Sequence, residues 1–426
     1  MTQPSGKLLT IEKPIYGGSF LARDEGKAVF VPLALPGEQA RVRMVEDKRS
    51  HAVAETEEIV VPSTDRVPPA CRHFGECGGC SYQHATYEAQ LRYKQAILRE
   101  TLERAGVAAP AQIEVLSGDP WRYRNRVRLA FDAEGRPGYR GRSSHAIVPI
   151  AECPIAAPLL VRAALAAGRI ARQLSAKVRV SEISLFCDAG ERALLAGATV
   201  SGGSRDAFDD LSRALAEEVA ELKGVEFVTE GGKRQAPHRV ALWGDRRLVY
   251  RAAGMDYRVD QGAFFQVNRW LVDELAERVT AGPPERLAWD LFAGVGLFAR
   301  KLASRFSRVL AVESAPASAE ALAHNLKGTR AQGIRSTTLD FLRRAVREGR
   351  PDLIVLDPPR AGLDRESAER ISAAGAPAVV YVSCDPATLA RDLRSLLAGG
   401  HSIESVTLAD LFPQTFHLES IVRLRR

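Results

Sequence analysis

The sequence predicts an α/β protein in which a doubly wound parallel sheet follows a small barrel and a central α+β region. Strand and helix patterns alternate from about residue 255 onward, with strands such as "RLAWDLFAG", "RVLAVES" and "AVVYVSCDP". This alternation is typical of a parallel sheet. Residues 8–60 alternate short apolar stretches with Gly and Pro, which indicates an antiparallel barrel of about five strands. Between the two regions, the strand patterns "RVRLAF" and "SEISLF" accompany an Ala-rich helix, "APLLVRAALAAGRIARQL".

The chain divides at two places. The Pro-rich stretch "VPSTDRVPPA" ends the first unit, and the alternating pattern begins after the mixed region. We therefore expect domains at 1–61, 62–252 and 253–426, in agreement with the roughly three domains that a chain of 426 residues suggests. A helix is expected over "HATYEAQLRYKQAILRETLERAG", early in the second domain.

The composition is that of a globular protein, with 46% hydrophobic and 26% charged residues. A formal net charge of +7 is compatible with a polyanionic partner without identifying one. The N-terminal "MTQPSGKLLTIEK" has no apolar signal core, and no run is long enough to span a bilayer. We expect a cytoplasmic protein that has no membrane partner and is monomeric by default.

The segment "DLFAGVGLFA" follows a predicted strand and opens a helix. Gly294 and Gly296 allow the backbone to approach a ligand closely, and Glu313 ends the next strand, where a carboxylate can bind two ribose hydroxyls. The spacing Gly-x-Gly-x-x-Ala also fits a dinucleotide such as NAD. In "LIVLDPPR", Asp357 precedes two prolines, so it marks either a second site at a strand end or a rigid turn.

The stretch "VSCDPATLA" places Cys384 at the carboxyl end of a buried strand, just before a helix. Open α/β sheets bind ligands at this edge, so Cys384 is either a core residue or a nucleophile. "FPQTFHLES" offers His417 and Glu419 for acid–base chemistry, although a solvated carboxylate is the simpler interpretation. "QGAFFQVNRW" contains Phe264 and Phe265 beside polar Gln266, which suggests a core contact and also the lip of a site.

Four cysteines form a candidate metal site. Cys71, Cys77 and Cys80 lie in "CRHFGECGGCSYQH", and Cys153 lies in "IAECPIA". Four thiols in a cytosolic chain indicate a metal site more often than disulfides, and the spacing fits zinc or a [4Fe–4S] cluster. Cys187, alone in a strand pattern, is expected in the core.

Alternating arginines in "WRYRNRVRLAF" form a candidate nucleic-acid contact. Arg122, Arg124, Arg126 and Arg128 share one face at strand spacing, and Arg136, Arg140 and Arg142 follow. Such a face can follow phosphates. The alternative is the solvated outer face of a sheet, which is less favourable without interleaved acids.

The segments "DLFAGVGLF", "VLDPPRAG", "VSCDPATLARDL" and "FPQTFHLE", in this order, resemble the S-adenosylmethionine-dependent RNA 5-methyluridine (uracil-C5) methyltransferases. "CRHFGECGGC" with Cys153 is similar to the iron–sulfur loop of the 23S rRNA branch of that family. Residues 8–60, with "ALPGE", resemble its TRAM domain, an OB-like RNA-binding barrel. The resemblance covers nearly the whole chain and implies a Rossmann-like methyltransferase sheet at its C-terminal end.

By this resemblance, Cys384 is the nucleophile and Glu419 the base that removes the C5 proton. It further implies S-adenosylmethionine contacts at Gln266, Phe292, Glu313, Asp340 and Asp357, and a [4Fe–4S] cluster on Cys71, Cys77, Cys80 and Cys153. Two positions depart from the family pattern. Leu297 stands where many members have Asn, and Gln414 stands where His is frequent.

The implied reaction explains why these residue types are needed. Thiolate addition at C6 of uracil activates C5 for attack on the sulfonium methyl, and a base must then remove the C5 proton. The uridine must leave its stack to reach both groups. The iron–sulfur loop favours 23S rRNA over tRNA as the partner by analogy. Two alternatives stay open: an NAD-dependent oxidoreductase and a non-catalytic RNA-binding iron–sulfur protein.

Overall fold

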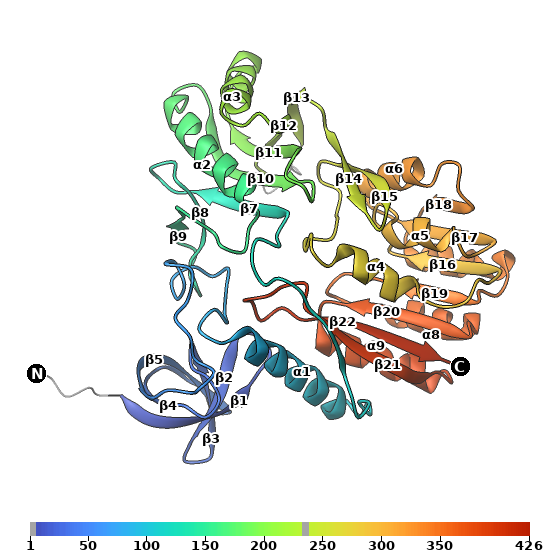
Figure 1. The fold of residues 1–426 in the computed structure, drawn as a ribbon, viewed down its shortest axis with the longest axis horizontal. Coiled ribbons are helices and arrows are strands. Elements are labelled where there is room, and N and C mark those ends of the chain that lie inside the picture. Colours follow the sequence, from blue (N-terminus) through green and yellow to red (C-terminus); the bar gives the residue numbers. More distant parts are fainter. Residues whose placement is uncertain (1–5, 232–237) are drawn as a thin grey trace, which may run out of the picture.

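The N-terminal region is a closed barrel of five strands, as the sequence predicts (Figure 1). The structure is a computed structural model, and it describes residues 6–231 and 238–426. The barrel has the strand order β1-β2-β3-β5-β4, and β4 closes it by pairing with β1. Alternate side chains such as Leu9 and Ile11 point into its core. The strands are β1 (Lys7–Pro14), β2 (Ser19–Asp24), β3 (Lys27–Pro32), β4 (Gln39–Asp47) and β5 (His51–Val61).

Helix α1 (Tyr87–Arg104) connects the barrel to the C-terminal sheet. The hydroxyl of Thr86 caps the helix by accepting a 3.3 Å hydrogen bond from the backbone N–H of Ala89. The apolar face of α1 joins a core of the C-terminal sheet, and the helix also contacts β1. The next strand, β6 (Glu114–Leu116), pairs with β21 (Ser402–Ala409) of that sheet. This part of the second predicted domain is therefore packed with the third, and the domain division stays a prediction.

The central region is a sheet of seven strands, with the order β13-β12-β11-β10-β7-β8-β9. Helices α2 and α3 cover one face of the sheet and share an apolar core with it (Figure 1). Cys187 is buried in this core, which confirms the expectation for it. The elements are β7 (Arg126–Phe131), β8 (Pro137–Arg140), β9 (Ile147–Pro149), α2 (Pro158–Gln173), β10 (Arg179–Cys187), β11 (Leu194–Ser201), α3 (Arg205–Glu218), β12 (Leu222–Thr229) and β13 (Arg239–Gly244).

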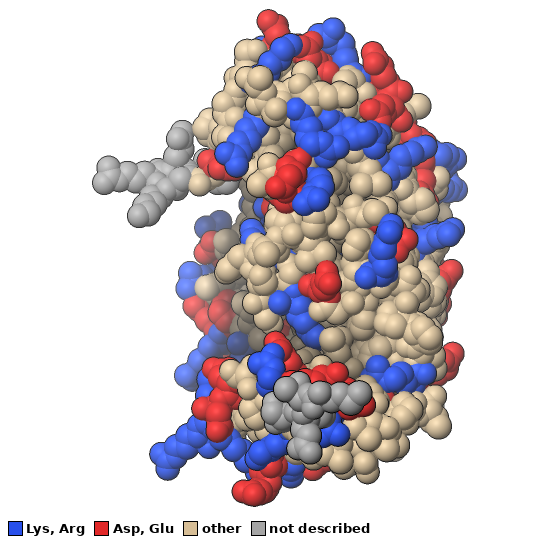
Figure 2. Space-filling view, turned by 90° about the vertical axis from the view of Figure 1, so that its left-hand side faces the viewer, with Lys and Arg blue, Asp and Glu red and all other residues tan. Residues whose placement is uncertain are grey.

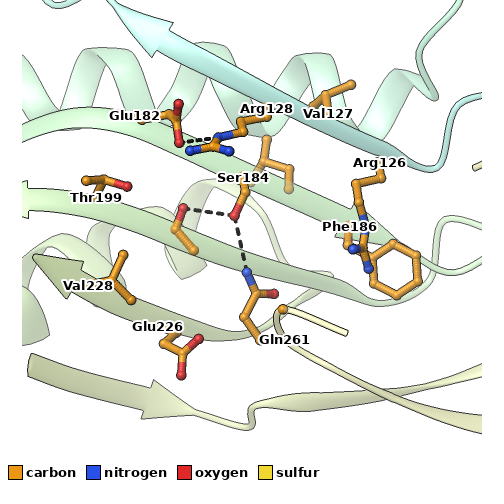
Figure 3. A pocket seen from close by; sticks show the side chains of 13 residues that line it. Arg126, Val127, Arg128, Glu182, Ser184, Phe186, Thr199, Glu226, Val228 and Gln261 are labelled. Carbon is orange, nitrogen blue, oxygen red and sulfur yellow. Dashed lines mark hydrogen bonds and ion pairs between the residues drawn. The ribbon is translucent and has the colours of Figure 1, made fainter. Parts of the chain in front are cut away.

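Arg126 and Arg128 line one pocket on the same face of β7, as the alternation predicts, and a phosphate contact there stays a prediction. Arg128 pairs with Glu182 of the neighbouring strand β10, and the guanidinium of Arg126 lies 4.3 Å from the ring centroid of Phe186 (Figure 3). Arg126 also donates a 2.7 Å hydrogen bond to the carbonyl of Ala263, and Arg124 lines the cysteine cavity described below. The sequence interleaves no acid with these arginines, but the adjacent strand supplies one.

Basic and acidic side chains lie interspersed on the face of the molecule that Figure 2 shows. That face includes the barrel and the central region. The formal charge of +7 is therefore the small difference between many charges of both signs. Within residues 6–231 and 238–426, no helix is long and apolar enough to cross a membrane.

The C-terminal sheet has eight strands, in the order β18-β17-β16-β19-β20-β22-β21-β6. Its first five strands are parallel, but β22 is antiparallel to β20 and to β21. The short connection between β21 and β22 explains this departure from an all-parallel sheet, since a parallel neighbour needs a long crossover. The hairpin of β14 (Arg247–Ala252) and β15 (Met255–Asp260) precedes the sheet.

Helices cover both faces of this sheet (Figure 1). Leu287, Trp289 and Leu291 of β16 pack into one apolar core, whereas Ala288 packs into the other. The mixed α/β architecture is therefore confirmed. The remaining elements are α4 (Val272–Thr280), β16 (Leu287–Leu291), α5 (Leu297–Leu302), β17 (Arg308–Glu313), α6 (Pro316–Asn325), β18 (Ala331–Arg335), α7 (Thr338–Arg344), η1 (Ala345–Glu348), β19 (Leu353–Leu356), α8 (Arg365–Ala374), β20 (Ala378–Ser383), α9 (Pro386–Ala398) and β22 (Glu419–Arg425).

Candidate active site

Four of the predicted site residues lie at the carboxyl ends of neighbouring strands. Phe292 directly follows β16, Glu313 ends β17, Asp357 directly follows β19, and Cys384 directly follows β20. Because these strands are parallel and adjacent, all four residues lie at one edge of the sheet. This edge is the candidate active site.

The pairing of β20 with β22 brings Cys384 and Glu419 together. Ser383 pairs with Ser420 in antiparallel register. Cys384, which follows Ser383, therefore lies opposite Glu419, which precedes Ser420. Glu419 is buried, and burial raises its pKa well above the usual range. Burial and then the nearby Glu419 raise the pKa of Cys384 to about 11. Burial therefore disfavours the ionised forms of both groups.

Asp357 and Gln266 extend this pair toward β19. The side-chain amide of Gln266 donates a 3.5 Å hydrogen bond to the Oδ2 of Asp357. Burial raises the pKa of Asp357 to about 7. The charge of Asp357 in turn raises the pKa values of Cys384 and Glu419. One carboxyl group therefore adjusts the ionisation of both candidate catalytic groups.

Glu313 is bound to the glycine turn after β16. Its carboxylate accepts a 2.9 Å hydrogen bond from the backbone N–H of Gly294 and a 2.6 Å hydrogen bond from that of Ala315. Gly296 has φ +94°, and a Cβ there would lie 2.7 Å from the side chain of Leu322, so the turn requires glycine. Leu297 is buried in the core. Its side chain therefore belongs to the packing, and only backbone from this position can face the site.

Asp340 lies in the first turn of α7. Its Oδ2 accepts a 2.7 Å hydrogen bond from the hydroxyl of Thr337, and the same hydroxyl accepts one from the backbone N–H of Asp340. This exchange caps the helix. The contact with adenine expected for Asp340 stays a prediction.

The segment from Asp410 to Leu418 joins β21 to β22 and leads into Glu419. Lys94 of α1 forms a fully buried ion pair with Asp410 at 2.6 Å and donates a 2.9 Å hydrogen bond to the carbonyl of Phe412. The side-chain Oε1 of Gln414 accepts a 3.0 Å hydrogen bond from the Nε2 of Gln90 on α1, and the backbone N–H of Gln414 donates a 3.0 Å hydrogen bond to the Oε1 of Gln90. Gln414 is buried, so at this position the chain has a structural anchor where the family often has His.

The barrel and the cysteine loop also contact this site. Tyr16 donates a 3.3 Å hydrogen bond from its hydroxyl to Asp385, the residue after Cys384. The backbone N–H groups of Ser81 and Tyr82 donate to the carbonyl of Gln414 at 2.9 and 3.0 Å. Segments far apart in the sequence therefore position the residues around the candidate pair.

Three charged groups near the site were not singled out from the sequence. Asp290 of β16 is fully buried, neither carboxylate oxygen has a hydrogen-bond partner among the described residues, and burial raises its pKa to about 8. Arg360 lies 3.0 Å from the Nδ1 of His417 and lowers the pKa values of Cys384 and Glu419. The third group is Lys94 of α1. The sequence contained a signal for two of the three groups: an acid within the strand "LAWDL" for Asp290, and a lysine on the apolar face of α1 for Lys94.

The four predicted metal-binding cysteines come together away from this edge. Cys71, Cys77, Cys80 and Cys153 all line one cavity of about 70 Å³, together with Arg124 and Tyr139. Burial raises the pKa of each of these thiols, that of Cys80 to about 12. Among the described residues, no three His, Cys, Asp or Glu side chains are arranged to hold a metal ion. The cluster therefore stays a prediction.

The fold and the sheet edge define an α/β enzyme in which a cysteine and a buried carboxyl group face each other at strand ends. A family model for tRNA (uracil-5-)-methyltransferases matches residues 243–426. Over 98% of this chain and 89% of the relative, the chain is 34% identical to a 23S rRNA (uracil(1939)-C(5))-methyltransferase RlmD of Chromohalobacter salexigens. It is also 35% identical to an uncharacterized RNA methyltransferase of Streptomyces avermitilis, over 96% of this chain and 95% of the relative.

The chain belongs to the family of RNA uracil-C5 methyltransferases, and it is an S-adenosylmethionine-dependent enzyme of that family. Its fold is similar to that of a Pyrococcus abyssi tRNA (uracil-54, C5)-methyltransferase in complex with S-adenosyl-L-homocysteine. That likeness has a TM-score of 0.78 at 23% identity and covers 98% of this chain and 100% of the other. The family assignment replaces the two alternatives, an NAD-dependent oxidoreductase and a non-catalytic RNA-binding protein.

Proposed function

We propose that this enzyme methylates C5 of one uridine in 23S rRNA through a covalent bond between Cys384 and C6, and that Glu419 resolves the adduct. The observation that supports this most directly is the register of β20 and β22, which sets Cys384 opposite Glu419. A soft nucleophile beside a carboxyl group is the pair that the reaction needs. The 23S rRNA target rests on the relative from Chromohalobacter salexigens.

The thiolate of Cys384 adds to C6 of the flipped uracil, which makes C5 nucleophilic. S-Adenosylmethionine supplies the electrophilic methyl group when it is bound. Glu419, once ionised, removes the C5 proton, and the electron pair of that C–H bond forms the C5–C6 double bond as Cys384 leaves C6 as a thiolate. Because burial holds the pKa values of both groups high, we infer that the cationic sulfonium and Arg360 favour their ionised forms in the ternary complex.

We assign the cofactor contacts to Gln266, Phe292, Glu313, Asp340 and Asp357. In favour of this set, Glu313 ends β17 beside the Gly294 turn, where a carboxylate suits ribose hydroxyls. Asp357 and Gln266 are hydrogen bonded next to Cys384, which suits the charged end of the cofactor. Asp340 lies at the start of α7 on the same side of the strand ends.

We propose that the barrel, residues 1–61, is a TRAM domain that grips RNA, followed by a central domain (62–252) and a methyltransferase domain (253–426). The hydrogen bond from Tyr16 to Asp385 supports a barrel that acts at the site. Transfer RNA is the alternative substrate, because the solved structure from Pyrococcus abyssi is a tRNA enzyme. We further propose a cytoplasmic monomer.

We propose that Cys71, Cys77, Cys80 and Cys153 hold a [4Fe–4S] cluster, with a zinc ion as the alternative. All four line one cavity. Donors near the sulfurs also suit thiolates: Gly79 donates its N–H to the Sγ of Cys77 at 3.4 Å, and Tyr139 donates its hydroxyl to the Sγ of Cys153 at 3.9 Å. Anaerobic protein with iron and sulfide near four each per chain would identify the cluster, whereas colourless protein with one zinc would reject it.

Two variants test the covalent mechanism, because they should fail at different steps. Cys384→Ala should bind RNA and S-adenosylhomocysteine but form no adduct and no product. Glu419→Gln should add to C6, transfer the methyl group and then stall, since an amide cannot take the C5 proton. Its labelled protein–RNA adduct should survive denaturing electrophoresis. Cys187→Ala, a core cysteine, is the matched control and should keep turnover; normal methyl transfer by folded Cys384→Ala would refute the assignment.

The target is tested separately. Mass-spectrometric mapping of 5-methyluridine in a deletion strain should show one position lost from 23S rRNA and none from tRNA. Loss from tRNA alone would select the alternative substrate and leave the mechanism in place.

A further inference from the structure

The face of the central sheet that α2 and α3 leave uncovered holds a pocket of about 330 Å³ (Figure 3). Apolar side chains on the other face, such as Ile183 and Val225, pack in the core under these helices. On the uncovered face, one row of residues crosses four strands in register: Arg128, Ser184, Gly197 and Glu226. Because Gly197 has no side chain, the row is hollow at its middle. We call this hollow the sheet-face pocket.

The segment after β15 forms one wall of the sheet-face pocket. The Nε2 of Gln261 donates a 3.2 Å hydrogen bond to the hydroxyl of Ser184, which itself donates a 3.3 Å hydrogen bond to the carbonyl of Gly197. A Cβ at Gly197 would lie only 2.5 Å from the Nε2 of Gln261, so glycine is what admits this carboxamide. Gly262 also lines the pocket. The pocket is therefore enclosed by a polar wall and differs from the open outer face of a sheet.

Arg126 is a partly buried cation at one end of the pocket. Its guanidinium lies 4.3 Å from the ring centroid of Phe186 and donates a 2.7 Å hydrogen bond to the carbonyl of Ala263. Its Nε is buried and has no acceptor among residues 6–231 and 238–426, and no carboxylate of these residues lies within 4.0 Å of it. Burial lowers the pKa of Arg126 to about 10, so it stays a cation at neutral pH. A desolvated cation without an anion favours a ligand that can interact with it.

The other charged groups of the pocket already have partners. Glu182 pairs with Arg128, and Glu226 pairs with Arg239 at 3.5 Å. The pocket therefore lacks the group of unpaired cations that a phosphate favours. The hydroxyl of Thr199 and the carboxamide on the wall line it instead. A flat, neutral ligand with polar edges suits these surroundings, and a nucleobase is such a ligand, because bases stack on guanidinium planes and hydrogen bond through their edges.

The start of β7 connects this pocket to the candidate active site. Asn125, just before β7, donates a 2.9 Å hydrogen bond to the carbonyl of Gln266, and the next residue holds the carbonyl of Ala263. The side chain of Gln266 is in turn hydrogen bonded to Asp357 at the sheet edge. Gly262 and Gln266 are close in the chain, which keeps them within about 14 Å of each other. Stacked nucleotides advance about 3.4 Å each, so a few nucleotides of bound RNA can cover this distance.

We propose that the sheet-face pocket receives one unstacked nucleobase of the substrate RNA, a few nucleotides away from the uridine that is methylated. Arg126 stacks on this base, and Thr199 and Gln261 hydrogen bond to its edge. The pocket thereby contributes to the choice of RNA by reading a base other than the target. This inference rests on the RNA methylation proposed above, but it uses no residue of the covalent mechanism.

The test is a binding cycle that combines pocket variants with RNA lacking single bases. The probes are synthetic RNA loops with the sequence around the methylated uridine, each with one abasic nucleotide at a different flanking position. Binding to the full-length protein is measured with S-adenosylhomocysteine present. One abasic position should lower the affinity of the wild type roughly tenfold. Arg126→Met and Thr199→Val should bind the intact RNA more weakly and lose nothing further at that position, because the base and the side chain belong to one interaction.

Arg128→Met is the matched control. Arg128 lies on the same face of β7, but its side chain is 74% exposed and is paired with Glu182. The loss from this variant and the loss from each abasic position should therefore add. Melting temperature and S-adenosylhomocysteine binding show whether each variant is folded. Thr199→Val removes only a hydroxyl from a partly exposed position, so it carries the test if Arg126→Met is unstable.

The remaining outcomes are distinct. Additive losses for Arg126→Met and Thr199→Val at every abasic position would overturn the proposal. Additive losses together with a salt dependence reduced by about one charge in Arg126→Met would identify a phosphate contact and refute the nucleobase. A wild type that methylates the intact RNA while all losses add would refute this inference and leave the proposed reaction intact. A wild type that methylates neither 23S rRNA nor tRNA would refute the proposed function and this inference with it.

Discussion

The protein contains partly buried thiols in two regions whose charged neighbours differ. At the sheet edge, Cys384 lies near the carboxyl groups of Glu419 and Asp357, and burial with the nearby Glu419 raises its pKa to about 11. In the cysteine cavity, burial raises the pKa of Cys80 to about 12, and the cavity is lined by one cation, Arg124, and one carboxylate, Glu152. Burial is thus combined with two nearby carboxyl groups at the sheet edge and with one charge of each sign around the cavity.

This difference indicates when each thiolate exists. A thiolate beside carboxylates is unfavourable until a cationic ligand arrives, so we expect Cys384 to ionise only during the reaction. A metal displaces the protons of the thiols that ligate it, so we expect thiolates in the cavity whenever the proposed centre is bound. Burial alone therefore does not separate a reactive cysteine from a structural one, whereas the carboxyl group of Glu419 directly opposite distinguishes Cys384.

The largest expected effect is the loss of methyl transfer when Cys384 is replaced by Ser, and the same substitution at Cys80 provides the comparison. Cys384→Ser should reduce methyl transfer at least ~10³-fold, because a hydroxyl is a far weaker nucleophile, while leaving the melting temperature and S-adenosylhomocysteine binding near the wild type. Cys80→Ser should instead lose metal and solubility. Single-turnover methylation, calorimetry and metal content distinguish the two. A soluble Cys80→Ser protein with full metal content would show that Cys80 is not a metal ligand.

Lys94 and Asp410 form an ion pair that is fully buried within the chain. Lys94→Met should destabilise the protein by about 3–5 kcal/mol, because Asp410 is left buried and unpaired. Lys94→Met with Asp410→Asn should recover part of this loss. Denaturant unfolding measures both variants, with Lys177→Met on an exposed pair as the control. A loss below about 1 kcal/mol, as for a surface pair, would contradict this role.

Asp290 tests how burial without a partner makes stability depend on pH. Its pKa is raised from 3.8 to about 8 by burial, so the folded protein binds a proton between these values that the unfolded chain has released. The stability from this proton is complete below pH 3.8 and is lost as the pH rises to about 8. Asp290→Asn should therefore gain about 1–3 kcal/mol relative to the wild type between pH 4 and pH 8.

Thermal melts across this pH range measure the gain. Asp352→Asn is a suitable comparison, because Asp352 is a carboxylate that is not buried and lies just before β19. A stability difference between Asp290→Asn and the wild type that does not change with pH would show that Asp290 stays ionised in the folded protein.

Arg360 gives the smallest expected effect. It opposes burial and Glu419 by lowering the pKa of Cys384, so Arg360→Gln should raise that pKa and slow methyl transfer at pH 8 several-fold. The rates of both proteins should rise toward alkaline pH as the thiolate fraction increases, with the profile of the variant displaced to higher pH. Single-turnover rates at saturating RNA separate this effect from weaker binding. An identical pH profile with only a higher KM would make Arg360 an RNA contact.

Much of the fold could be predicted from local patterns. The barrel, the helix at 87–104, the Ala-rich helix and the alternating C-terminal elements all follow from periodicity. Of the candidate site, Phe292, Glu313, Asp357 and Cys384 were predictable because each lies at the end of a recognisable strand. The acid that pairs with Arg128 was not predictable, because Glu182 lies on a strand that is distant in sequence.

By itself the sequence determined which segments become strands and helices and which chemical groups stand at their ends, because periodicity and turn residues act over a few neighbours. Only the tertiary structure decided which buried charges have partners. Lys94 and Asp410 are 316 residues apart and meet at 2.6 Å, whereas the carboxylate of Asp290 is buried without a hydrogen-bond partner among the described residues. Such pairings depend on Coulomb energies at distances of a few ångströms, and the chain establishes those distances only by folding.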